Sequence, residues 1–267
     1  MTWFAELGDY YFFDLDGCVY FSDRPAPGAA EVLQFLRDAG KGVAFVTNNS
    51  TDSREELAAR LQGMGLAAEP EEMFAAGELV GPYLLGRFGP SKVKVIGSRS
   101  LHRALERSGH TVLPLDSGQT AEIVVLGRDV RFSYERIMIC LEELEKGARG
   151  IATNPDLWHP GPGGRRIPET GAFALLLEAA GGKKFEFFGK PDPGMFRLAM
   201  ERVGAERPDR CVMVGDNLST DIAGGRAAGM RTVWLTNGEA RPDPFPADRT
   251  PDAVYRDLAD VSAREML

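Results

Sequence analysis

Short runs of apolar residues alternate with amphipathic stretches along the chain, and this alternation predicts βα units that build a parallel sheet. The apolar runs have the length of strands, and the stretches between them have the length of helices. The predicted strands are residues 10–13, 43–46, 93–96, 123–126, 185–188, 212–214 and 232–235. The fold class is therefore α/β, with a Rossmann-like, doubly wound parallel sheet.

The stretch between the first two runs illustrates the pattern. Its apolar residues recur at helical spacing, at Ala29, Val32, Leu33 and Leu36. Gly40 then stands where a helix commonly ends. We therefore predict a helix over residues 29–39, which completes a first βαβ unit.

Four polar clusters each follow the end of one of these apolar runs. In an open parallel sheet, that carboxyl edge is where ligands bind. Any one cluster alone is compatible with a turn, a helix cap, a surface lysine or a loop. Together they predict one shared site, built from residues 14–17, 47–50, 189–191 and 215–221.

The first cluster carries two carboxylates that suit phosphoryl transfer. This reaction needs an in-line nucleophile, neutralisation of charge on the phosphoryl oxygens and a proton for the leaving oxygen. Asp14 is the candidate nucleophile. Asp16 lies two residues on, so in an extended segment it projects to the same side. There it would protonate the leaving ester oxygen and later deprotonate the attacking water.

The overall charge demands a local source of positive charge at such a site. The net charge of −8 and the pI near 5.1 disfavour binding to nucleic acid, and they also repel anionic metabolites. Lys190 is a compact cation that would hold the phosphoryl group and Asp14. Asp14 and Asp216 also suit Mg²⁺, which prefers oxygen ligands and takes one or two carboxylates.

The second cluster offers hydrogen-bond donors for a phosphoryl oxygen. The Thr47 hydroxyl and the backbone N–H of Asn48 are the candidates. Asn49 and Ser50 either contact the substrate or shape the turn.

With these motifs, the sequence resembles subclass IIA of the haloacid dehalogenase (HAD) superfamily, the group of para-nitrophenyl, phosphoglycolate and pyridoxal phosphate phosphatases. The pattern D-x-D-G, a strand-end Thr, Lys and G-D-x-x-x-x-D is present, and the forms T-N-N-S, G-K-P and T-D-I are characteristic of the subclass. The resemblance covers essentially the whole chain. It implies the HAD fold and a Mg²⁺-dependent phosphatase that hydrolyses small phosphorylated metabolites through a phosphoaspartate on Asp14.

The resemblance also extends the candidate metal site. It adds the backbone carbonyl of Asp16 as a ligand. It places Asp221 in the second coordination shell, where it orients waters or Asn217. Asp221 alternatively caps a helix over residues 222–228.

The spacing of the clusters locates a second domain. One βα unit separates Asp14 from Thr47, whereas the interval from Thr47 to Lys190 is much longer. We predict an insertion over residues 82–184, with residues 1–81 and 185–267 forming the core. The insertion resembles the α/β cap of subclass IIA, and the family commonly pairs through its caps, which implies a homodimer. A cap that closes over the site favours small substrates.

Within the insertion, residues 153–171 resemble the family's substrate-specificity loop. His159 either contacts the substrate or lies in a surface loop. The family often has P-G-T-G where this chain has Glu169 in place of the first Gly. This departure adds negative charge near a site for anions.

Two alternatives to hydrolysis stay open. One is a phosphotransferase that passes the phosphoryl group to another hydroxyl. The other is a regulatory module in which phosphorylated Asp14 is a signal, although Asp16 and the large insertion count against it. The lifetime of the phosphoaspartate distinguishes a hydrolase from a regulatory module. Product analysis with excess alcohol acceptor distinguishes a hydrolase from a phosphotransferase.

The remaining composition predicts a cytoplasmic protein. Cys18, Cys140 and Cys211 each lie in an apolar run and are expected to be core residues in a reducing compartment. The first ten residues do not resemble a secretory signal, and no apolar run reaches the ~18 residues needed to span a membrane.

Overall fold

The computed structural model describes residues 3–161 and 164–266, and it divides the chain into two compact units. The first unit contains Met1–Thr47, Arg54–Phe74 and Lys190–Leu267, and the second contains Asn48–Ser53 and Ala75–Gly189. The second unit therefore begins before the predicted boundary at residue 82. Helix α4 (Ala76–Phe88) continues through Pro82, so it is a single element that belongs to one unit.

The first unit is built on a six-stranded sheet with the order β15-β14-β13-β1-β4-β5. Its strands are β1 (Tyr10–Phe13), β4 (Gly42–Thr47), β5 (Met73–Ala75), β13 (Cys211–Gly215), β14 (Arg231–Leu235) and β15 (Ala253–Tyr255). The pairs from β15 across to β4 are parallel. Strands β1 and β13 are buried almost throughout, as expected for parallel strands covered on both faces.

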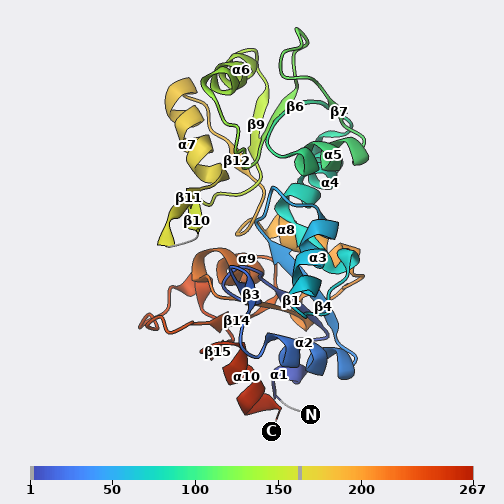
Figure 1. The fold of residues 1–267 in the computed structure, drawn as a ribbon, viewed down its shortest axis with the longest axis vertical. Coiled ribbons are helices and arrows are strands. Elements are labelled where there is room, and N and C mark those ends of the chain that lie inside the picture. The colour runs from blue at the N-terminus through green and yellow to red at the C-terminus, as the bar shows by residue number, and fades with distance from the viewer. Residues whose placement is uncertain (1–2, 162–163, 267) are drawn as a thin grey trace. The chain divides into compact units, whose positions relative to one another are not determined.

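Helices of the first unit come from both ends of the chain, drawn in blue and in orange to red (Figure 1). They are α1 (Trp3–Glu6), α2 (Ala29–Asp38), α3 (Arg54–Gly63), α8 (Pro193–Arg202), α9 (Ala223–Ala227) and α10 (Leu258–Glu265). The predicted helix over residues 29–39 is confirmed as α2, and its four apolar residues are buried. Two short strands, β2 (Tyr20–Phe21) and β3 (Arg24–Pro25), form a separate antiparallel pair.

The second unit has its own parallel sheet, in the order β12-β9-β8-β6-β7. Its strands are β6 (Lys92–Ile96), β7 (Thr111–Val112), β8 (Ile123–Leu126), β9 (Arg149–Ala152) and β12 (Glu186–Phe187). Its helices are α4, α5 (Arg99–Arg107), α6 (Tyr134–Glu145) and α7 (Thr170–Gly181). An antiparallel hairpin of β10 (Trp158–Pro160) and β11 (Arg166–Pro168) precedes α7.

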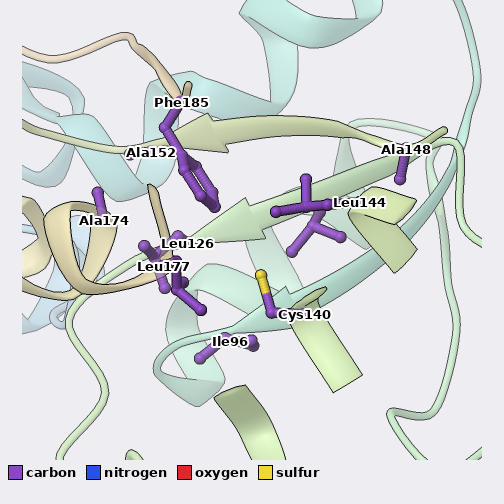
Figure 2. Packing of buried hydrophobic residues seen from close by; sticks show 10 residues of the cluster. Ile96, Leu126, Cys140, Leu144, Ala148, Ala152, Ala174, Leu177 and Phe185 are labelled. Atoms are coloured by element: carbon purple, nitrogen blue, oxygen red, sulfur yellow. The ribbon is translucent and has the colours of Figure 1, made fainter. Parts of the chain in front are cut away.

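The predicted strand over residues 185–188 was assigned to the core, but its strand β12 joins the sheet of the second unit. Glu186 pairs with Ile151 of β9. The preceding Phe185 belongs to the same apolar cluster as Leu144 and Cys140, which Figure 2 shows. Burial of Phe185 in that cluster explains why the second unit extends to Gly189.

Further findings concern the fold class, the cysteines and the membrane. The α/β class with parallel sheets is confirmed. Cys18, Cys140 and Cys211 are buried free thiols, as expected for core residues. In the described part of the chain, no helix is long and apolar enough to cross a membrane.

Candidate active site

The order of strands in the first sheet brings three sequence-predicted residues to one edge. Asp14 follows β1, Thr47 ends β4, and Asp216 follows β13. Strand β1 lies between β4 and β13 and is parallel to both, so the three carboxyl ends are neighbours. The Asp14 N–H donates to the Val214 carbonyl at 2.9 Å, which extends the pairing into the site.

Three carboxylates converge at this edge. Asp14, Asp216 and Asp221 each offer one oxygen, and these oxygens lie within 4.8 Å of one another. Asp14 and Asp221 are buried, and Asp216 is half-buried.

The glycines of the two acidic motifs make this approach possible. Gly17 has a φ of +87°, and a Cβ there would lie 2.3 Å from Asp216 Oδ2. A Cβ at Gly215 would lie 2.3 Å from Asp221 Oδ2. Any larger residue at either position would push a carboxylate out of the cluster.

Lys190 provides the positive charge within the cluster. Its ammonium contacts the Asp14 carboxylate, lies 2.7 Å from Asp221 Oδ1 and donates to the Val46 carbonyl at 3.0 Å. Burial alone lowers the pKa of Lys190, but Asp14 and Asp221 outweigh it and raise that pKa above its ordinary value. Lys190 is therefore a fixed cation.

The negative charge of the cluster exceeds what Lys190 neutralises. Burial raises the pKa of Asp14 well above its ordinary value, Lys190 opposes this, and Asp221 and Asp216 add to it. Burial, together with the Asp221 carboxylate, raises the pKa of Asp216 to about 7. Clustered carboxylate oxygens that lack enough positive charge suit a hard divalent cation, so these residues form a candidate metal site.

Asp221 lies in a single π-helical turn, Leu218–Ile222, and not at a helix N-cap. The N-cap of that turn is Asn217, whose Oδ1 accepts the Ser219 N–H at 2.8 Å. The backbone N–H of Asn217 donates to Asp221 Oδ2 at 3.1 Å. Asp221 is thus oriented by Lys190 on one oxygen and by Asn217 on the other.

Asp16 has a different environment from the other carboxylates. Its side chain is exposed, and its Oδ2 accepts a hydrogen bond from the Tyr20 hydroxyl at 2.8 Å. Sequence reasoning missed Tyr20, and it also missed Trp234, whose indole N–H donates to the Asp216 carbonyl at 2.8 Å. Trp234 comes from β14, and no local pattern links it to Asp216.

Asn48, Asn49 and Ser50 belong to the second unit by their contacts. Asn48 Nδ2 donates to Asp156 Oδ2 at 2.8 Å. Asn49 Oδ1 accepts the backbone N–H groups of Thr51 and Asp52, at 2.8 and 2.9 Å. Of the two interpretations of Asn49, these bonds correspond to shaping the turn.

His159 also belongs to the second unit. Its Nδ1 lies 2.7 Å from Glu169 Oε1, and Arg128 Nη1 lies 3.3 Å from the same oxygen. Burial raises the pKa of Glu169, although Arg128 and His159 oppose the rise. The negative charge that Glu169 adds to this segment is therefore paired with Arg128 and with His159 when the imidazole is protonated.

Comparisons with known proteins identify the family of this chain. The sequence pattern of the haloacid dehalogenase-like hydrolases matches residues 11–111, and a second, HAD-hydrolase-like pattern matches residues 187–261. Dihydroxyacetone phosphatase of Corynebacterium glutamicum is 34% identical over 257 residues, which cover 94% of this chain and 90% of the relative.

Solved structures show the same similarity. The 4-nitrophenylphosphatase of Thermotoga maritima is 31% identical with a TM-score of 0.87, covering 97% of this chain and 98% of its own. Glycerol phosphate phosphatase of Mycobacterium tuberculosis, solved with calcium, is 26% identical with a TM-score of 0.88, covering 96% of this chain and 75% of its own. This chain therefore belongs to the haloacid dehalogenase-like hydrolases of subclass IIA and is a phosphatase, a hydrolase of phosphate monoesters.

Proposed function

We propose that this phosphatase hydrolyses monoesters of small phosphorylated metabolites, with Mg²⁺ as cofactor, through a phosphoaspartate on Asp14. The observation that carries the proposal is the cluster of Asp14, Asp216 and Asp221 around the buried Lys190. It combines a nucleophile, a fixed cation and an excess of carboxylate oxygens at one edge of the sheet. These are the parts that phosphoryl transfer requires.

The proposed metal ligands are the carboxylates of Asp14 and Asp216 and the backbone carbonyl of Asp16. Asp221, held by Asn217, would orient water in the second shell. Phosphatases of this family are generally metal dependent. When bound, Mg²⁺ would neutralise charge on the phosphoryl oxygens next to the nucleophile. Calcium in the glycerol phosphate phosphatase structure supports a divalent cation with oxygen ligands.

In the first proposed step, an Asp14 carboxylate oxygen forms a bond to phosphorus while the ester P–O bond breaks. Asp16 gives its proton to the departing oxygen. In the second step, Asp16 takes a proton from water, whose oxygen attacks phosphorus and displaces Asp14, releasing inorganic phosphate. Lys190 keeps Asp14 and a phosphoryl oxygen in place throughout, and the Thr47 hydroxyl and the Asn48 N–H bind the other oxygens.

We propose that the second unit acts as the cap and selects the substrate. Its own sheet and core support an independent role for it. His159 is its candidate substrate contact, whereas the Asn49 side chain shapes the turn. Dihydroxyacetone phosphatase and glycerol phosphate phosphatase are among the relatives, so three-carbon phosphate esters are the first substrates to test. Homodimerisation through this unit and a cytoplasmic location stay predictions from the sequence.

The test is release of inorganic phosphate from a panel of sugar phosphates, glycerol phosphate, dihydroxyacetone phosphate, phosphoglycolate, nucleotides and pyridoxal phosphate. We expect turnover to need Mg²⁺ and to stop with a chelator. Asp14→Asn should stop turnover and leave no trapped phosphoenzyme, since an amide of the same size is a far poorer nucleophile. Full turnover in chelator would refute the metal, and turnover in Asp14→Asn would refute the nucleophile.

A further inference from the structure

We propose that Tyr20 is a positioning residue for the acid–base step: its hydroxyl holds one oxygen of Asp16 and leaves the other to carry the proton. The inference rests on the proposed role of Asp16 as general acid and base. It adds a residue that the motif pattern does not contain.

The hydroxyl and the carboxylate meet in a favourable geometry. The Tyr20 side chain is 2% exposed, whereas Asp16 is exposed, so a buried ring presents its hydroxyl to a carboxylate at the surface. The hydroxyl donates to Asp16 Oδ2 at 2.8 Å. Among the residues that the structure describes, no other side chain hydrogen-bonds to Asp16. Its Oδ1 is therefore available for proton transfer.

The backbone between the two residues is closed into a tight loop. The N–H groups of Val19 and Tyr20 both donate to the Leu15 carbonyl, at 2.9 and 3.1 Å. The Gly17 N–H donates to the Tyr20 carbonyl at 2.9 Å, which ties the residue after Asp16 to Tyr20 itself. The loop therefore holds the backbones of Asp16 and Tyr20 close together, and the hydroxyl contact adds the constraint on the carboxylate.

This arrangement matters because an exposed carboxylate otherwise samples several rotamers. The terminal torsion of an aspartate is broad, and a proton donor must lie within hydrogen-bond reach of the leaving oxygen when the bond breaks. Misplacement of a reacting group by about 1 Å can cost ~10²-fold in rate. Holding Asp16 should therefore matter most for leaving groups that need a proton.

The experiment compares Tyr20→Phe, Asp16→Ala and the double variant with wild type on glycerol phosphate and on para-nitrophenyl phosphate. Tyr20→Phe removes the hydroxyl and keeps the buried ring. We expect kcat on glycerol phosphate to fall ~10–100-fold, kcat on para-nitrophenyl phosphate to fall much less, and KM to change little. In the Asp16→Ala background, removing the hydroxyl should change neither rate. The ratio of the two rates on one sample is independent of the amount of folded enzyme.

Tyr11→Phe is the matched control. Tyr11 is a buried tyrosine of β1, and its hydroxyl donates to the Phe4 carbonyl. Its loss should leave the ratio of the two rates unchanged. An equal loss on both esters in Tyr20→Phe, or a loss that persists without Asp16, would overturn the inference. If Asp16→Ala itself leaves the ratio unchanged, the proposed role of Asp16 fails, and the inference fails with it.

Discussion

Lys190→Met removes the ammonium from the carboxylate cluster while keeping a side chain of similar length. Lys190 Nζ lies 2.7 Å from Asp221 Oδ1, and at an effective dielectric constant of about 20, Coulomb's law gives ~6 kcal/mol for such a pair. Proton uptake by the stranded carboxylates returns part of this energy. We therefore expect the metal-free variant to lose ~3–5 kcal/mol of unfolding free energy, as for other broken buried ion pairs.

The loss should depend on pH in a defined direction. Lys190 lowers the pKa of Asp14 and of Asp216, so both values rise when it is removed. A carboxyl group whose pKa is raised in the folded state destabilises the fold as pH rises above its unfolded pKa, because folding then disfavours ionisation. The destabilisation by Lys190→Met should therefore be larger at pH 8 than at pH 5.5.

In this variant, Mg²⁺ should restore part of the stability but not the rate of catalysis. Saturating Mg²⁺ supplies positive charge to the carboxylates and should return part of the lost stability. It cannot take the place of Lys190 at the phosphoryl oxygen, so kcat on para-nitrophenyl phosphate should still be ~10²–10³-fold below wild type. The assay is urea unfolding by circular dichroism, with and without Mg²⁺ at both pH values, beside steady-state kinetics.

Lys94→Met is the matched control. Lys94 is as buried as Lys190 and forms an ion pair with Glu143 at 3.1 Å in the second unit. Loss of the Lys94 ammonium should lower the unfolding free energy of the metal-free protein to a similar extent, but Mg²⁺ should not restore that stability. Equal stability of Lys190→Met and wild type at pH 8 without metal would refute the reasoning, as would equal rescue of both variants by Mg²⁺.

Three further predictions concern other residues. Because the pKa of Asp216 is raised from 3.8 to about 7, this carboxyl group should lower the unfolding free energy of the metal-free protein progressively from about pH 4 to 7. Mg²⁺ should cancel this trend. A urea midpoint that stays constant over this pH range would contradict the prediction. Asp16→Asn should accumulate phosphoenzyme in rapid-quench trapping and lose more activity on alkyl phosphates than on para-nitrophenyl phosphate, whereas equal losses without trapped intermediate would exclude its role. Gly171→Ala should destabilise the second unit, since the new Cβ would lie 2.2 Å from the Pro155 carbonyl oxygen. Gly86→Ala in helix α4, where a Cβ would meet no atom within 4 Å, should instead stabilise this unit by ~0.5–1 kcal/mol. Thermal unfolding of the two variants tests the difference.

The sequence alone predicted the candidate catalytic residues of the first unit. Acidic, hydroxyl and lysine side chains directly follow apolar strands, and parallel strands place such positions at one edge. The βα alternation and the helix at Ala29–Asp38 are likewise local patterns of hydrophobic spacing, so they could be predicted without knowing any contact. The candidate roles of Asp14, Asp216 and Lys190 followed from residue type and order.

Tertiary structure decided what depends on contacts between distant segments. The strand at Glu186–Phe187 pairs with β9, and residues 48–53 join the second unit, although both lie beside core motifs in the sequence. Tyr20 and Trp234 support the site through single hydrogen bonds, which require no repeating pattern. A side-chain hydrogen bond forms only where folding brings a donor and an acceptor within about 3 Å of each other. Hydrophobic periodicity describes one element at a time, so it does not predict the distance between atoms of different elements.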